Sequence, residues 1–123
     1  MSPSPDTSPP LSDVERGLVA GILIGEGHFG GDGRYPHITL RMHVRHEQLF
    51  HWLHGRFPRS KLYGPYNHGG RRYYQWMARG PALVEDVLPI VESVLTDDVD
   101  PHVLGRIREM RANYADFFAR HER

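Results

Sequence analysis

The 123-residue sequence contains no cysteine, which excludes disulfides, cysteine-ligated zinc and thiol catalysis. No apolar run reaches the roughly 18 residues that a membrane span requires. The N-terminus has no basic stretch followed by an apolar run, so no secretory signal is expected. Lysine occurs only once, at Lys61. We therefore expect a cytoplasmic, soluble protein with one compact domain and no contact with a membrane.

Charge is unevenly distributed along the chain, although the formal net charge is zero. The window from Arg34 to Arg79 contains nine arginines or lysines and a single acid, Glu47, whereas acids exceed bases on both flanks. A block with one sign of charge is a candidate surface for a polyanion. The alternative at this stage is a solvated face whose arginines pair with acids of the flanks.

The start of the chain divides into a tail and the beginning of a domain. Residues 1–11 are rich in Pro and Ser and have no apolar period, which predicts a disordered tail before a domain over 12–121. Ser12 is a candidate helix N-cap, with Glu15 as its partner in a capping box. The helix that begins here is expected to reach Gly25.

Apolar periodicity predicts a mixed architecture after this helix. Gly27 to Asp32 indicates a short strand, and strict alternation over His37–Arg45 indicates a strand with one apolar and one cationic face. A second hairpin is expected from Lys61–Tyr66 and Arg71–Ala78, with a turn over 67–70. Further helices are expected over 46–57, 81–95 (with a kink at Pro89) and 101–119. The result is an α+β protein whose four-stranded antiparallel sheet has helices on one face.

Three glycines recur every four residues in the first helix, at Gly17, Gly21 and Gly25. Each costs roughly 1 kcal/mol relative to alanine inside a helix, so the stripe requires a compensating gain. Small residues at this spacing allow a second helix to approach closely, which predicts a homodimer through the helix over 13–25. The expected interface comprises Gly17, Ala20, Gly21, Ile24 and Gly25, with Leu18 in the subunit's own core. The alternative is that the glycines admit a nearby sheet.

An acid, Glu26, follows the glycine stripe directly. A carboxylate at a helix C-terminus is electrostatically unfavourable, but together with free carbonyls it suits a hard divalent cation. If two such helices pack as twins, two carboxylates meet at the twofold axis and repel unless metal neutralises them.

The segment Val19–Gly27, VAGILIGEG, resembles the motif that names the LAGLIDADG homing endonucleases, and Phe29 matches the aromatic that often follows it. The resemblance implies an αββαββα fold with a saddle-shaped sheet, here followed by an additional C-terminal helix, and activity on double-stranded DNA. It implies that Glu26 and the Gly25 carbonyl hold a catalytic Mg²⁺ or similar ion such as Mn²⁺, and that a chain with one motif acts as a homodimer. Ile24 departs from the usual Asp of the motif.

The resemblance also implies roles for basic and polar residues. Arg79 is the candidate for stabilising the developing charge, Lys61 is its alternative, and Gln48 is a candidate for ordering water. Base and phosphate contacts are expected from the sheet face opposite the helices. The expected DNA-binding residues are His28, Arg34, His37, Thr39, Arg41, His43, Arg45, Lys61, Tyr63, Arg71, Tyr73 and Gln75.

Two functions remain open from the sequence. The first is a site-specific endonuclease of a mobile intron or intein, which needs divalent metal and no small-molecule cofactor. The second is a catalytically inactive nucleic-acid-binding protein on the same fold, either a maturase for intron RNA or a transcription regulator. A zinc site at His51 and His54 is a weaker interpretation, because histidines that face solvent are common near DNA.

Overall fold

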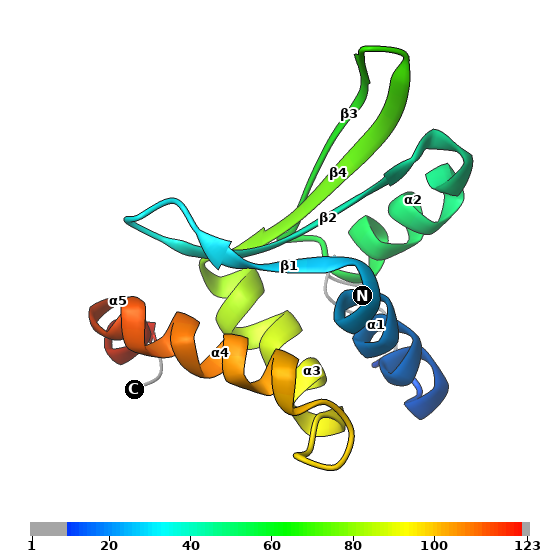
Figure 1. Cartoon of the computed structure of the whole chain (residues 1–123). Helices are drawn as coiled ribbons and strands as arrows, with labels where there is room; N and C mark the ends of the chain where they lie inside the picture. Colours follow the sequence, from blue (N-terminus) through cyan, green and yellow to red (C-terminus); the bar gives the residue numbers. More distant parts are fainter. Residues whose placement is uncertain (1–9, 122–123) are drawn as a thin grey trace, which may run out of the picture.

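The sheet has four antiparallel strands, and a computed structural model describes it within residues 10–121 (Figure 1). The strand order is β1-β2-β4-β3, so the two hairpins meet along β2 and β4. The predicted α+β architecture is confirmed. The elements are α1 (Asp13–Glu26), β1 (Gly27–Gly31), β2 (Pro36–His43), η1 (Val44–His46), α2 (Glu47–Arg56), β3 (Lys61–His68), β4 (Arg71–Arg79), η2 (Ala82–Val87), α3 (Leu88–Val94), α4 (Pro101–Asn113) and α5 (Ala115–His121).

Helix α1 begins at the predicted capping box. The Glu15 amide donates to Ser12 Oγ at 3.1 Å, and the Ser12 amide donates to Glu15 Oε1 at 2.9 Å. These bonds satisfy two of the backbone groups that a helix terminus leaves free. Residues 1–9 of the expected tail lie outside the described part of the chain, and Leu11 packs against the core.

Helix α1 passes into β1 without a loop, and Gly27 is the residue at the junction. Its amide still donates to the Leu23 carbonyl, while its own backbone is already extended. A Cβ at this position would lie 2.6 Å from the Leu23 oxygen. A side chain at position 27 would therefore clash with the Leu23 backbone, and this clash is the reason that glycine is needed here. The backbone conformation is not the reason, since a φ of −76° is one that any residue adopts.

Gly27→Ala is expected to destabilise the protein by about 1 to 3 kcal/mol, the usual cost of forcing an extra methyl into a packed site. Urea unfolding provides the measurement. Gly55→Ala in α2 is the matched control, because a Cβ there meets no atom within 4 Å, and it should stabilise by up to about 1 kcal/mol. Equal stability of the two variants would contradict the junction as described.

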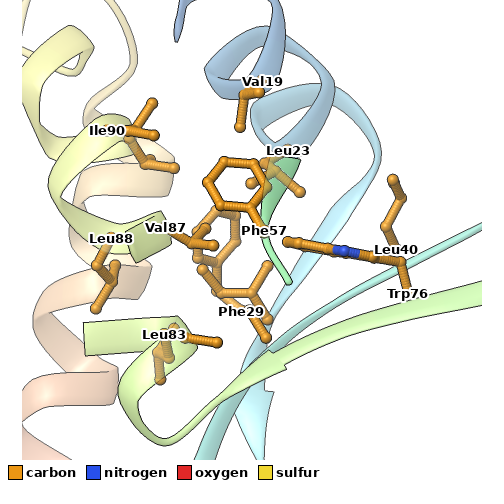
Figure 2. Close-up of a cluster of buried hydrophobic side chains, with 14 of the residues drawn as sticks. Val19, Leu23, Phe29, Leu40, Phe57, Trp76, Leu83, Val87, Leu88 and Ile90 are labelled. Atoms are coloured by element: carbon orange, nitrogen blue, oxygen red, sulfur yellow. The ribbon is translucent and has the colours of Figure 1, made fainter. Parts of the chain in front are cut away.

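The core fills the space between the sheet and the helices (Figure 2). Leu23 from α1, Leu40 from β2 and Trp76 from β4 are fully buried in it. Trp76 packs against the Phe57 ring, with centroids 6.1 Å apart, and its indole N–H donates to Ser60 Oγ at 2.8 Å. This buried bond satisfies the one polar group that Trp76 brings into the core. The core thus fixes which sheet face is open to solvent.

Two predicted elements of the first half end differently. The strand expected to reach Arg45 ends at His43, and Val44–His46 form a 3-10 turn. The second hairpin has longer strands than expected, joined by a two-residue turn of Gly69 and Gly70, both at positive φ. Paired positive φ values are what a tight hairpin turn requires, and glycine adopts them without steric cost.

The C-terminal half differs in helix form. The expected disturbance at Pro89 occurs as a π-helical segment, η2, just before it, where the Leu88 amide donates to the Leu83 carbonyl. Proline has no N–H to donate, so a shift of register next to it avoids a missing bond. The single helix expected over 101–119 is wrong: it breaks at Tyr114 into α4 and α5. The break brings the Tyr114 hydroxyl to the β1–β2 loop, where it accepts from the Gly33 amide at 3.0 Å.

Candidate nucleic-acid interface and the end of helix α1

One face of the sheet points away from the helices, and we call it the open face. Paired residues of antiparallel strands share a face, so the register assigns its members. Residues that are paired from strand to strand form rows across the sheet. Two examples are His28–Thr39–Met77–Lys61 and Arg41–Gln75–Tyr63. The open face comprises His28, Gly30, His37, Thr39, Arg41, His43, Lys61, Tyr63, Tyr66, His68, Arg71, Tyr73, Gln75, Met77 and Arg79.

The four strands contain no aspartate or glutamate. Of the nine cations between positions 34 and 79, Arg56 and Arg59 pair with acids, and no other ion pair of the nine is found within residues 10–121. The Arg59 guanidinium forms ion pairs with Asp86 at 2.6 Å and with Glu85 at 2.8 Å. These carboxylates raise the pKa of the guanidinium. Pairing with acidic flanks therefore accounts for two cations only, and the open face keeps its positive charge.

Arg41 and Gln75 form the centre of the open face. Arg41 Nε donates to Gln75 Oε1 at 2.6 Å, and its guanidinium lies 6.0 Å from the centre of the Tyr73 ring. Both are expected DNA-binding residues, and the hydrogen bond joins them as one unit. Arg45 lies outside the strand, yet its amide donates to His43 Nδ1 at 3.0 Å, which keeps it beside this face.

Arg34 lies in the loop between β1 and β2, not on a strand. The Asp32 carboxylate accepts from the amides of Arg34 at 2.8 Å and Tyr35 at 2.7 Å. These backbone bonds lower the pKa of Asp32, so the carboxylate that caps the loop stays ionised. Together with the Tyr114 hydroxyl, they give the loop a defined shape on which the Arg34 side chain is exposed.

Sequence reasoning missed Tyr66, His68 and Met77 on the open face. A bulge between Tyr63 and Tyr66 adds one residue to β3 and moves the alternation from odd to even positions. The Gly64-Pro65 pair was the available signal, because proline and glycine inside a strand often mark a bulge. Met77 continues the alternation of β4 that the sequence already displays.

The outer face of α1 is open within the protomer. A Cβ at Gly17, Gly21 or Gly25 would meet no atom within 4 Å. This finding excludes the alternative in which the glycines admit the protomer's own sheet. Val14 and Leu18 flank the stripe with 83% and 47% of their surface exposed. Leu18, expected in the core, is therefore part of an exposed apolar face on this helix.

Two other residues expected at the helix interface are less exposed than the glycine stripe. Ala20 is fully buried in the protomer, so its side chain is absent from the exposed face of α1. Ile24 is partly buried and packs against the core. The helix turns these positions inward because they are offset by one residue from the glycine stripe, which is about 100° around the helix axis.

Glu26 is the last residue of α1, and both it and Gly25 are exposed. Within residues 10–121 its carboxylate makes no hydrogen bond or ion pair. Its neighbour Gly27 pairs with Leu40, so the register places Glu26 opposite the Leu40–Arg41 step of β2. Arg41 is therefore the open-face cation nearest to Glu26 in register.

The expected catalytic cations lie farther away in the protomer. Arg79 pairs with His37, which is four residues, or roughly 13 Å, along β2 from Arg41. Lys61 is on β3, three strand spacings, or roughly 14 Å, from β1. Gln48 is exposed in the first turn of α2 and is not part of the open face. Within one protomer, the structure does not bring Arg79 or Lys61 beside Glu26.

No three His, Asp or Glu side chains among residues 10–121 are arranged to hold a metal ion. His51 approaches Glu47 at 3.7 Å, but Glu47 accepts a hydrogen bond from the Tyr74 hydroxyl at 2.5 Å. Within the described residues, Glu26 is thus not part of a three-residue cluster of this kind. No helix of the described chain is long and apolar enough to cross a membrane.

Comparison with known proteins gives a likeness of fold. No protein-family model and no curated protein sequence matches the chain. Its structure is similar to a solved one, the group I intron-encoded homing endonuclease I-CeuI complexed with DNA, with a TM-score of 0.66 and 17% sequence identity. The match covers 87% of this chain and 56% of that endonuclease chain. The predicted fold is thus confirmed: the chain has the LAGLIDADG-type α+β fold of that endonuclease.

Proposed function

We propose that this chain is a site-specific DNA endonuclease that acts as a homodimer and requires a divalent metal ion. One observation carries the proposal. The exposed glycine face of α1 ends at Glu26, whose carboxylate has no partner within residues 10–121, at the point where the helix meets the cationic sheet. The proposed dimer helix and the proposed metal ligand are therefore directly connected to the proposed DNA surface.

The open face is the proposed DNA surface. A face without acids attracts the phosphate backbone, and release of condensed counterions supplies much of the affinity. In the proposal Arg41 and Gln75 read base edges as a coupled pair, while arginines such as Arg71 contact phosphate. The I-CeuI structure is a complex with DNA, which supports this use of the fold.

The exposed face of α1 is the proposed dimer interface. Val14 and Leu18 leave apolar surface in water, and pairing with a second α1 removes it at about 25 cal/mol for each Å² buried. The open glycines let the two backbones approach closely. Pairing along this stripe brings the two Glu26 carboxylates toward the twofold axis, and the bound site is then a roughly palindromic DNA sequence with half-sites about 10 bp apart.

The donor set at the end of α1 fits a hard cation. Glu26 supplies a carboxylate and Gly25 a backbone carbonyl, and oxygen ligands of this kind suit Mg²⁺ or Mn²⁺. When bound, such an ion supplies an activated water and neutralises charge on the scissile phosphate. In this proposal two protomers contribute the ligands jointly.

Selection from a random-site DNA library tests the function. The wild-type protein should enrich one family of roughly palindromic sequences and cut them with Mg²⁺, whereas EDTA should leave binding and stop cleavage. Enrichment without cleavage in Mg²⁺ or Mn²⁺ would refute the enzyme and indicate a non-cleaving binder. If the enriched site spans the insertion point of an intron or intein, the protein also acts in the mobility of that element.

A further inference from the structure

A hollow of about 470 Å³ lies at the rim of the sheet, where β3 begins, β4 ends and α5 passes beneath. Three cations line it: Arg59, just before β3, Lys61, the first residue of β3, and Arg79, the last residue of β4. Tyr35, Phe117 and His121 also line it. We call this feature the rim hollow.

The three cations of the rim hollow differ in their partners. Arg59 is paired with two carboxylates, Asp86 and Glu85, so this cluster contributes no positive charge and has one carboxylate in excess. Lys61 and Arg79 are exposed and form no ion pair within residues 10–121. With the excess carboxylate beside Arg59 included, the rim hollow has a net positive charge of one, and its exposed cations are Lys61 and Arg79.

The aromatic residues that line the rim hollow contact one another. Tyr35 packs edge-on against Phe117 with ring centroids 6.3 Å apart, and His121 lies over Phe117 at 4.3 Å. Aromatic surface of this kind can contact the apolar edge of a sugar, while the cations of the same hollow donate hydrogen bonds to phosphate oxygens. Cations that share a hollow with apolar surface suit a phosphodiester with its sugar better than a bare inorganic ion.

The position of the rim hollow relates it to the open face and to α1. Lys61 and Arg79 are both members of the open face, so the two surfaces are continuous. Helices α1 and α5 lie at opposite ends of the protomer (Figure 1). In a dimer joined through α1, the two rim hollows would lie at the outer ends of the DNA footprint.

We propose that the rim hollow binds a backbone phosphate of duplex DNA at the outer end of each half-site, through Lys61 and Arg79. This inference rests on the proposed function. It also gives Lys61 and Arg79 a role in binding that agrees with their distance from Glu26, in place of a role in bond cleavage.

Salt dependence tests this role. The double variant Lys61→Ala/Arg79→Ala should lower affinity equally for cognate and unrelated duplexes, and should reduce the slope of log K against log salt by about 1 to 2, since each phosphate contact contributes about 0.9. Arg106→Ala/Arg108→Ala on α4 removes the same charge on the helix side and should leave the slope unchanged.

A series of duplex lengths locates the contact. Trimming a few base pairs from each end of the bound duplex should weaken wild-type binding but leave the affinity of the double variant unchanged, because that variant has already lost the outer contact. A variant that keeps the wild-type slope, or one that binds normally but cuts slowly, would overturn the inference. If the wild-type protein binds no DNA in any of these assays, the proposed function fails as a whole, and this outcome is distinct from failure of the rim hollow alone.

Discussion

Glu26→Gln is expected to abolish Mg²⁺-dependent cleavage while DNA binding remains intact. Changing a residue that only orients a metal ligand commonly costs 10- to 100-fold, so losing the ligand itself should cost at least about 100-fold. The open face is unchanged in this variant, so affinity measured in EDTA should match the wild type. Single-turnover cleavage of a selected site provides the measurement.

The folded Glu26→Gln variant is expected to be slightly more stable than the wild-type protein. A carboxylate at a helix C-terminus is unfavourable by about 0.3 to 1 kcal/mol, and the Glu26 side chain makes no bond within residues 10–121 that would be lost. Glu109→Gln, the same change on the exposed surface of α4, is the matched control for cleavage. Wild-type cleavage by Glu26→Gln would remove Glu26 from the proposed site, whatever the DNA affinity.

Gly21→Glu should convert the proposed dimer to a monomer that still folds. Nothing in the protomer lies within 4 Å of a Cβ at this position, so the new side chain is free of clashes in the isolated chain. Replacing glycine in a helix interior adds up to about 1 kcal/mol of helix stability. Between two closely packed helices the same side chain has no room, and two added carboxylates near the axis repel. Sedimentation of wild type and variant across a concentration series measures the change.

The control for Gly21→Glu is Gly105→Glu in α4, another helical glycine with open space around its Cβ. This control should keep the wild-type oligomeric state and cleavage. The Gly21→Glu variant should lose cleavage together with the dimer, because the proposed site takes ligands from two protomers. A Gly21→Glu protein that remains dimeric would rule out the α1 interface, and a monomeric one that still cuts would rule out shared ligation.

The parts of the fold that the sequence predicted are those governed by local signals. The Ser12–Glu15 capping box and the alternation of β2 depend on neighbours within a few residues, and both are present in the structure. The open glycine face also agrees with the spacing of the stripe, because a helix maps spacing onto one side.

Other features depend on contacts between distant segments, and these could not be predicted. The break at Tyr114 exists because its hydroxyl meets Gly33, which is 81 residues away. The placement of Arg79 and Lys61 follows from the strand order β1-β2-β4-β3, and alternation along a single strand carries no information on that order. For this reason the sequence assigned both cations to the vicinity of Glu26, whereas the register separates them from it.

The junction at Gly27 has a consequence for how a dimer would measure its target. Helix and strand are continuous there, with no linker to bend. The angle between the two sheets of a dimer would then follow from the crossing angle of the two α1 helices alone. A base pair inserted between the half-sites moves one half-site by about 3.4 Å and rotates it about the DNA axis. A rigid junction would not let one sheet move relative to the other to match the displaced half-site. The dimer would therefore bind only sites with one spacing between their half-sites.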